Sequence, residues 1–147
     1  MPHARTQIRD AVLAAVSNLP TTRRNAFASR VHPMNDNELP CLLVFTREEA
    51  AERMSTMPPR TFKRTLTVIV EGYVKLTSTY DDKLDKIAVE VEKAIYENPS
   101  LAGIVRDIFI SNTAITLTGD AEKPVAVISM SFVAEYITRE NDPETLA

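Results

Sequence analysis

The longest regular pattern in the chain is an alternation of apolar and polar positions over residues 60–76. Most even positions are apolar, interrupted by Arg64 and Gly72, and these apolar residues are Phe62, Leu66, Val68, Val70, Val74 and Leu76. A period of two predicts a strand with one buried face and one wetter face. Burial of each large side chain is worth about 1.5–3 kcal/mol, so this strand is expected to organise the fold.

Four other stretches predict strands. Residues 39–46 form a short apolar run, typical of a strand buried on both faces. Residues 125–137 alternate over a second long span, and residues 108–118 alternate with a break near Asn112 that indicates a bend or bulge. Residues 22–31 are more polar, and their arginines are typical of an edge strand, where charge discourages stray pairing.

Two stretches have helical spacing of apolar residues. Residues 4–19 carry one apolar stripe, and Pro20 ends the predicted helix because a residue before proline avoids helical geometry. A second helix is expected to begin at Ser78 or Thr79 and to end before Pro99. Its stripe consists of Leu84, Ile87, Ala88, Val91, Ala94 and Ile95.

These elements predict an α+β (α/β) fold. Two helices cannot cover both faces of such a sheet, so we expect a mixed, mostly antiparallel sheet of four to five strands with both helices on one face. The other face, with Ile69, Tyr73, Val127 and Val133, is then partly exposed and suits a partner subunit. The 147 residues predict a single domain, residues 1–147, with a folded core over 4–139 and a loose charged tail over 140–147.

The polar segment 47–59 is predicted to be a long loop, with room for one helical turn. Met54 and Met57 lie near its tip, and methionine adapts to irregular partner surfaces. We therefore expect a projecting contact loop that includes Arg47 and Arg60 as well. A loop whose methionines fold back on the sheet is the alternative.

Charge is unevenly distributed along the chain. The net charge is only −3, which argues against general affinity for nucleic acid. The first thirty residues are basic and include Arg23, Arg24 and Arg30, whereas the end of the chain is acidic and includes Glu135 and Glu140. These five residues are candidates for complementary surfaces of neighbouring subunits. Simply solvated charge is the alternative.

The residue types that usually carry chemistry are scarce. Cys41 is the only cysteine, the two histidines are His3 and His32, and the three glycines are too few for a phosphate-cradling loop. We expect no catalytic residue, no metal, no cofactor and no enzymatic activity. The N-terminus does not resemble a secretory signal, and no apolar run is long enough to span a membrane, so synthesis in the cytoplasm is expected. By elimination, a binding or structural role is favoured.

Several segments together carry a family resemblance. They are TQIRDAVLAAV at the first helix, ELPCLLVF and the polar REEAAERMSTMPPR, then TLTVIVEGYVK, DDKLDKIAVEVEKAI and NPSLAGIV. From about residue 5 to 139 the chain resembles the tail terminator proteins (minor tail protein U family) of long non-contractile-tailed, lambda-like bacteriophages. The match is one of layout and short patterns, notably LP before the second strand and PSLAGIV after the second helix.

This resemblance implies a small subunit that forms a hexameric ring on the finished tail tube, stops its polymerisation and presents the surface for head joining. Its implied partners are further copies of itself, the tail tube protein and head–tail connector proteins, with no membrane and no specific nucleic acid. It implies a place at the head-proximal end of the virion tail and in the host cytoplasm during assembly. The alternatives are another phage neck protein (a head–tail connector or tail-completion protein), a small-molecule-binding α/β regulatory module, and an enzyme with an unrecognised site.

Overall fold

The computed structural model describes residues 2–28, 38–98, 100–101, 103–118 and 124–146. The two helices are α1 (Ala4–Ala15) and α2 (Tyr80–Tyr96). The six strands are β1 (Ala26–Phe27), β2 (Cys41–Arg53), β3 (Thr61–Lys75), β4 (Asp107–Thr118), β5 (Val125–Arg139) and β6 (Asp142–Leu146).

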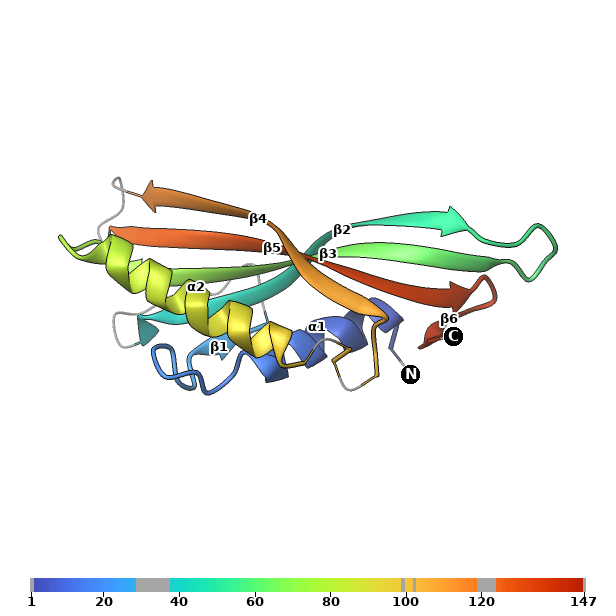
Figure 1. The fold of residues 1–147 in the computed structure, drawn as a ribbon, viewed down its shortest axis with the longest axis horizontal. Helices are drawn as coiled ribbons and strands as arrows, with labels where there is room; N and C mark the ends of the chain where they lie inside the picture. Colours follow the sequence, from blue (N-terminus) through green and yellow to red (C-terminus); the bar gives the residue numbers. More distant parts are fainter. Residues whose placement is uncertain (1, 29–37, 99, 102, 119–123, 147) are drawn as a thin grey trace.

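All six strands form one strongly twisted sheet (Figure 1). The order is β1-β2-β3-β5-β4, and β6 pairs with β5. Among the described strands, only the pairing of β1 with β2 is parallel, so the sheet is mixed and mostly antiparallel, as predicted. The predicted strand number of four to five is too low, because the end of the chain contributes a sixth strand.

The two long strands β3 and β5 pair along their whole length, from Thr61 opposite Arg139 to Lys75 opposite Val125. The even-numbered apolar residues of β3, from Leu66 to Val74, are buried, which confirms the predicted inner face. Their neighbours on β5 are equally buried and include Met130 and Phe132. This pair of strands is therefore the floor of the core.

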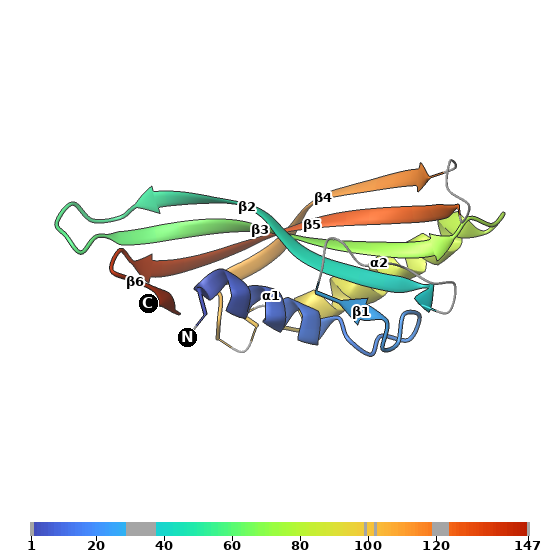
Figure 2. The same ribbon diagram turned by 180° about the vertical axis from the view of Figure 1, so that it is seen from behind.

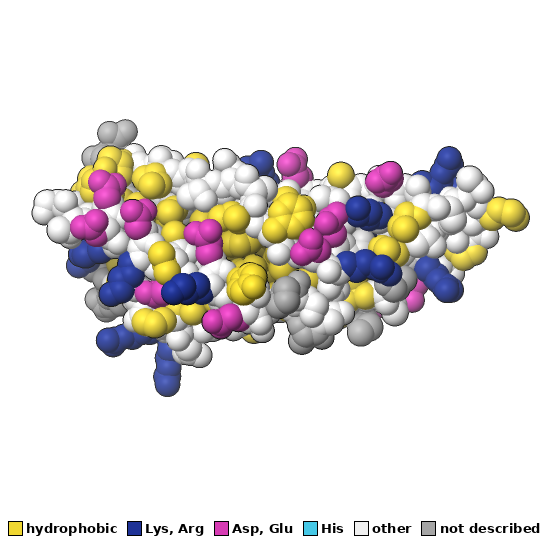
Figure 3. Space-filling model, in the orientation of Figure 1, with side chains coloured by type: hydrophobic (Ala, Val, Ile, Leu, Met, Phe, Trp, Pro, Cys, Tyr) yellow, Lys and Arg dark blue, Asp and Glu magenta, His cyan; other side chains and the backbone are white. Residues whose placement is uncertain are grey.

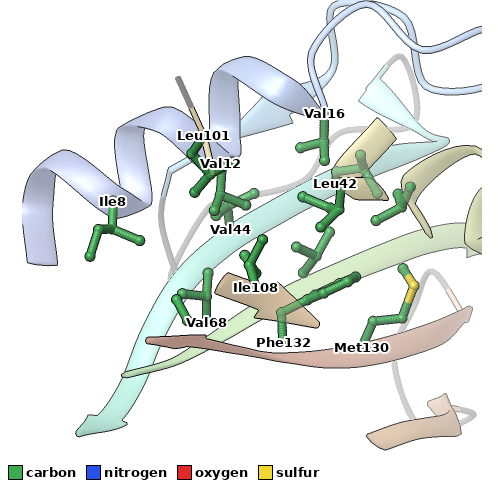
Figure 4. Packing of buried hydrophobic residues seen from close by; sticks show 14 of the residues in the cluster. Ile8, Val12, Val16, Leu42, Val44, Val68, Leu101, Ile108, Met130 and Phe132 are labelled. Atoms are coloured by element: carbon green, nitrogen blue, oxygen red, sulfur yellow. The ribbon is translucent and has the colours of Figure 1, made fainter. Parts of the chain in front are cut away.

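Both helices contribute to one hydrophobic core. Ile8, Val12 and Val16 point from the first helix segment toward Leu42 and Val44 on β2 (Figure 4). The inward residues of α2 belong to the same core and include Leu84, Ile87, Val91 and Ile95. Figures 1 and 2 show both helices on the same side of the sheet.

Gly72 lets α2 approach the sheet closely. A Cβ atom at this position would lie 2.9 Å from Ile87 Cγ2 on α2 and 3.1 Å from Ile128 Cγ2 on β5. The first distance is shorter than carbon atoms tolerate, so a side chain here would displace the helix or its neighbours. The glycine that interrupts the apolar face of β3 is thus part of the packing.

The opposite face of the sheet is less exposed than predicted. Ile69 and Val127 are buried, whereas Tyr73 and Val133 are half-buried. Cross-strand neighbours explain the difference, since Ile69 lies directly opposite Phe45 on β2. Val127 is flanked in the same way by Tyr73 on β3.

Four segment boundaries differ from the sequence predictions. The first helix ends at Ala15, and the expected edge strand over 22–31 is reduced to β1, with 29–31 outside the described residues. Strand β2 continues to Arg53, so half of the predicted loop is a strand. The segment expected to be a loose tail forms β6 on β5. The bulge predicted near Asn112 is present.

Candidate assembly surfaces

The β2–β3 hairpin extends from one end of the molecule as a long arm (Figure 1). β5 ends at Arg139 opposite Thr61, so the turn of this arm, residues 54–60, reaches past the strand beside it. The Met54 amide donates to the Thr61 carbonyl oxygen at 2.7 Å, and the Thr61 amide donates to Ser55 Oγ at 2.9 Å. We call residues 54–60 the arm tip.

Both methionines of the arm tip face solvent. Met54 is 55% exposed and Met57 is 77% exposed, so neither folds back on the sheet. Arg47 lies in β2 and is also exposed, with Glu48 at 3.8 Å. Arg60 is engaged within its own chain, because its guanidinium lies 3.1 Å from both carboxylate oxygens of Glu140. The predicted role of these four residues toward the tail tube stays a prediction.

An ion cluster joins the arm to the body of the molecule. Glu49 lies 2.8 Å from Arg5 on α1 and 3.1 Å from Arg64 on β3, and it accepts a hydrogen bond from the Tyr136 hydroxyl. Arg64 Nε also donates to Thr138 Oγ1 at 2.8 Å. Glu49 reaches this inner face because the β2–β3 register shifts between Thr46 and Glu48. Arg64, an interruption in the sequence pattern, is thus partnered.

The two acidic residues predicted for the subunit interface form ion pairs within their own subunit. Glu135 lies 3.1 Å from Lys63, and Glu140 is paired with Arg60. Arg23 and Arg24 are exposed in the turn after α1, and Arg30 lies outside the described residues. A contact between these two sets in neighbouring subunits remains a prediction.

The turn that carries Arg23 and Arg24 is fixed to the second helix. Thr21 donates from its amide to Glu90 Oε1 at 2.9 Å and from its hydroxyl to Glu90 Oε2 at 2.5 Å. Within the turn, the Asn18 amide donates to the Arg23 carbonyl oxygen at 2.8 Å. These hydrogen bonds therefore fix the position of the turn that carries the two arginines.

A second apolar surface, which the sequence analysis missed, lies between α2 and β4. Its hollow has a volume of about 400 Å³. We call it the groove; it is lined by Glu92, Lys93, Ile95, Tyr96, Ile108, Phe109, Ile110 and Phe132. Figure 3 shows hydrophobic side chains over α2 and β4 with acidic and basic side chains around them.

The bulge in β4 extends this apolar surface along the strand. Ile110 lies opposite Phe132, and after the bulge Ile115 lies opposite Ile128 and Leu117 opposite Ala126. All three β5 residues face the core, so even-numbered residues before the bulge and odd-numbered residues after it share one face. The sequence signal was this change of parity.

β4 is also an edge strand, last in the order β1-β2-β3-β5-β4. One side of its backbone is consequently without a strand neighbour in the described sheet, and most of its side chains from Ser111 onward are exposed. A long edge with apolar side chains is a template for pairing with another chain.

The titratable groups with shifted pKa values are tied to packing. Burial raises the pKa of the Cys41 thiol to about 12. Burial and the hydrogen bond to Glu49 raise the pKa of Tyr136, and burial and Glu71 raise that of Tyr73. Burial and the positive charges of Arg5 and Arg64 lower the pKa of His3.

Neither a metal site nor a membrane-spanning helix is found among the described residues. Within the described ranges, no group of three or more His, Cys, Asp or Glu side chains is arranged to hold a metal ion. Among the helices that the structure describes, none combines the length and apolar character needed to cross a membrane.

Comparison with known proteins gives one family. The family model described as phage minor tail protein U matches residues 3–136. No curated protein matches the chain. Among solved structures, a chain of the virion of a native gene transfer agent particle is similar at 14% identity, with a TM-score of 0.44 over 90% of each chain.

Proposed function

Because the chain belongs to the phage minor tail protein U family, and so is a structural protein of a phage tail, we propose that it is a tail terminator. In this role, identical subunits form a ring that caps the tail tube, stops its polymerisation and provides the surface for head joining. The proposal goes beyond the family match, and features of the subunit support it.

The observation that carries the proposal is the open edge strand β4 with the groove beside it. A monomer that remains single usually covers such an edge or places charges along it. Here the edge carries Phe109, Ile115 and Leu117, each about half exposed. An apolar edge of this length is suited to assembly with other subunits.

Two different surfaces suit a ring better than a dimer. The arm tip and the groove are distinct patches of the same subunit, and contacts between distinct patches run head to tail. Such contacts close into a ring if the rotation between subunits allows it. The family resemblance makes six the expected number of subunits.

The remaining parts of the proposal concern partners and place. We expect the ring to contact the tail tube protein on one side and head–tail connector proteins on the other. The subunit would assemble in the host cytoplasm and then lie at the head-proximal end of the virion tail.

Native mass spectrometry combined with negative-stain imaging over a concentration series tests ring formation. The expected result is a closed six-fold ring at the higher concentrations or on addition of tail tubes. A discrete dimer that persists in the presence of tubes would contradict the proposal and favour a regulatory module.

A further inference from the structure

The exposed large hydrophobic side chains of the described residues gather in only two places. Met54 and Met57 lie at the arm tip. Two of the other five, Tyr96 and Phe109, line the groove. All five lie on α2 or β4: Val89, Tyr96, Phe109, Ile115 and Leu117. One set is at the end of a projecting arm, and the other borders a hollow.

We propose that the arm tip of one subunit inserts into the groove of the next subunit. This inference rests on the proposed ring and names the contact that closes it. The occupant of the groove is therefore a second copy of this chain, through Met57 and Met54.

The two surfaces match in chemistry. The hollow of about 400 Å³ is of the size that takes a bound group, and its lining includes the aromatic residues Tyr96, Phe109 and Phe132. Methionine is unbranched and polarisable, so it fills irregular apolar hollows, and its sulfur makes favourable contacts with aromatic rings. Tyr96 is 82% exposed and would gain most from being covered.

The charges around the two surfaces include one complementary pair. Arg53 directly precedes the arm tip and is exposed, and Glu92 lines the groove and is exposed. Lys and Arg side chains lie near the end of the arm, and acidic side chains lie among basic ones over α2 (Figure 3). The lining of the groove includes Lys93 as well as Glu92, so the complementary pair is Arg53 with Glu92. Opposite charges at the edge of a contact guide association and fix its register.

The direction of the contact follows from the fold. The arm tip projects past the end of β5, whereas the groove lies between the C-terminal half of α2 and β4 (Figure 1). Each subunit offers one tip and one groove, so every contact leaves a free tip and a free groove until the assembly closes.

Site-specific cross-linking tests the contact directly. Cys41 is buried with its pKa raised, so the wild-type protein is expected to be unreactive and each added cysteine reports its own position. The test pair is Met57→Cys in one protein and Tyr96→Cys in another, mixed and treated with a short bismaleimide. The control pair replaces Tyr96→Cys by Lys86→Cys, an exposed position that lines a different hollow, with Thr21 and Val74.

We expect the mixed test pair to give one cross-linked dimer, at least about tenfold more abundant than with the control pair. A chain that carries both Met57→Cys and Tyr96→Cys should give a ladder of bands up to the full ring. Rings that form by negative stain with no cross-link above the control would overturn the inference and leave the ring proposal standing. Cross-linking of Met57→Cys to added tail tube protein instead would overturn it as well.

A charge swap provides a second measurement that does not depend on cysteines. Arg53→Glu alone and Glu92→Arg alone should each weaken assembly about tenfold, because the reversed charge meets a like charge at the edge of the contact and slows association. The two changes together should restore assembly to near the wild-type level. Failure of the double variant to recover, with each variant folded by its thermal melt, would overturn the pairing; protein that stays monomeric even with tail tubes would instead refute the proposed ring.

Discussion

The ion cluster around Glu49 provides the sharpest test of how the arm is fixed to the body. We predict that Glu49→Ala destabilises the folded protein strongly. The Glu49 side chain is 9% exposed and that of Arg64 is 15% exposed, so the substitution leaves a largely buried guanidinium without its carboxylate.

The magnitude follows from the partners. Breaking a buried ion pair by removing one member costs about 3–5 kcal/mol. Arg64 keeps its hydrogen bond to Thr138, which places the cost at the lower end, and the contact with the 43% exposed Arg5 adds at most about 1 kcal/mol. We therefore expect a loss of about 3 kcal/mol, or about 10 °C in melting temperature for a domain of this size.

Urea denaturation at one fixed protein concentration measures this loss as a shift of the midpoint with unchanged slope. Glu48→Ala is the matched control, because Glu48 directly precedes Glu49 and its side chain is 70% exposed. The control should lie within about 0.5 kcal/mol of the wild type. A Glu49→Ala midpoint equal to that of the control would refute the buried character of the cluster.

Three further predictions concern other contacts. Gly72→Val should destabilise the protein by about 1–3 kcal/mol, because the new side chain meets Ile87; a wild-type urea midpoint would contradict this packing. Burial holds the Cys41 thiol protonated in the folded protein, so its contribution to the free energy of unfolding is complete below pH 9.0. This contribution is lost as the pH rises from 9.0 toward about 12, because the unfolded thiol ionises before the folded one. The stability of Cys41→Ala should accordingly fall less steeply over that range, and identical slopes would count against it. Ending the chain after Asn141 removes β6 and the packing of Leu146, which should cost about 1–2 kcal/mol; an unchanged thermal melt would show that β6 adds nothing.

The sequence predicted the elements that are built by side-chain burial. The long alternation over β3 and β5 marks two strands whose inner faces are fully packed. The stripe that begins at Leu84 marks α2 for the same reason. In these elements the hydrophobic pattern and the backbone pairing indicate the same structure.

The sequence failed where backbone pairing alone makes a strand. The C-terminal part of β2, residues 47–53, is exposed on nearly every position, so no apolar alternation marks it. β6 includes Pro143 and acidic residues, yet it pairs with β5 at Thr138. Neither segment carries an apolar alternation, because few of its side chains are buried.

The groove could not be predicted for a related reason. Ile110 and Ile115 differ in parity, and only the bulge between Ile110 and Asn112 brings them to one face. Tyr96 lies off the apolar stripe of α2, and the sequence analysis assigned it no role. Tyr96 lines the groove only because β4 packs beside the helix in the folded protein.

The most direct test of the proposed function is a tube-capping measurement. Purified protein is added to the polymerising tail tube protein of the same phage, and tube lengths are measured by negative-stain imaging. We expect the tubes to stop growing and to carry a ring at one end, with no further growth on addition of fresh tube protein. Tubes that keep elongating, while the protein binds only the head portal complex, would contradict the terminator role and identify another neck protein.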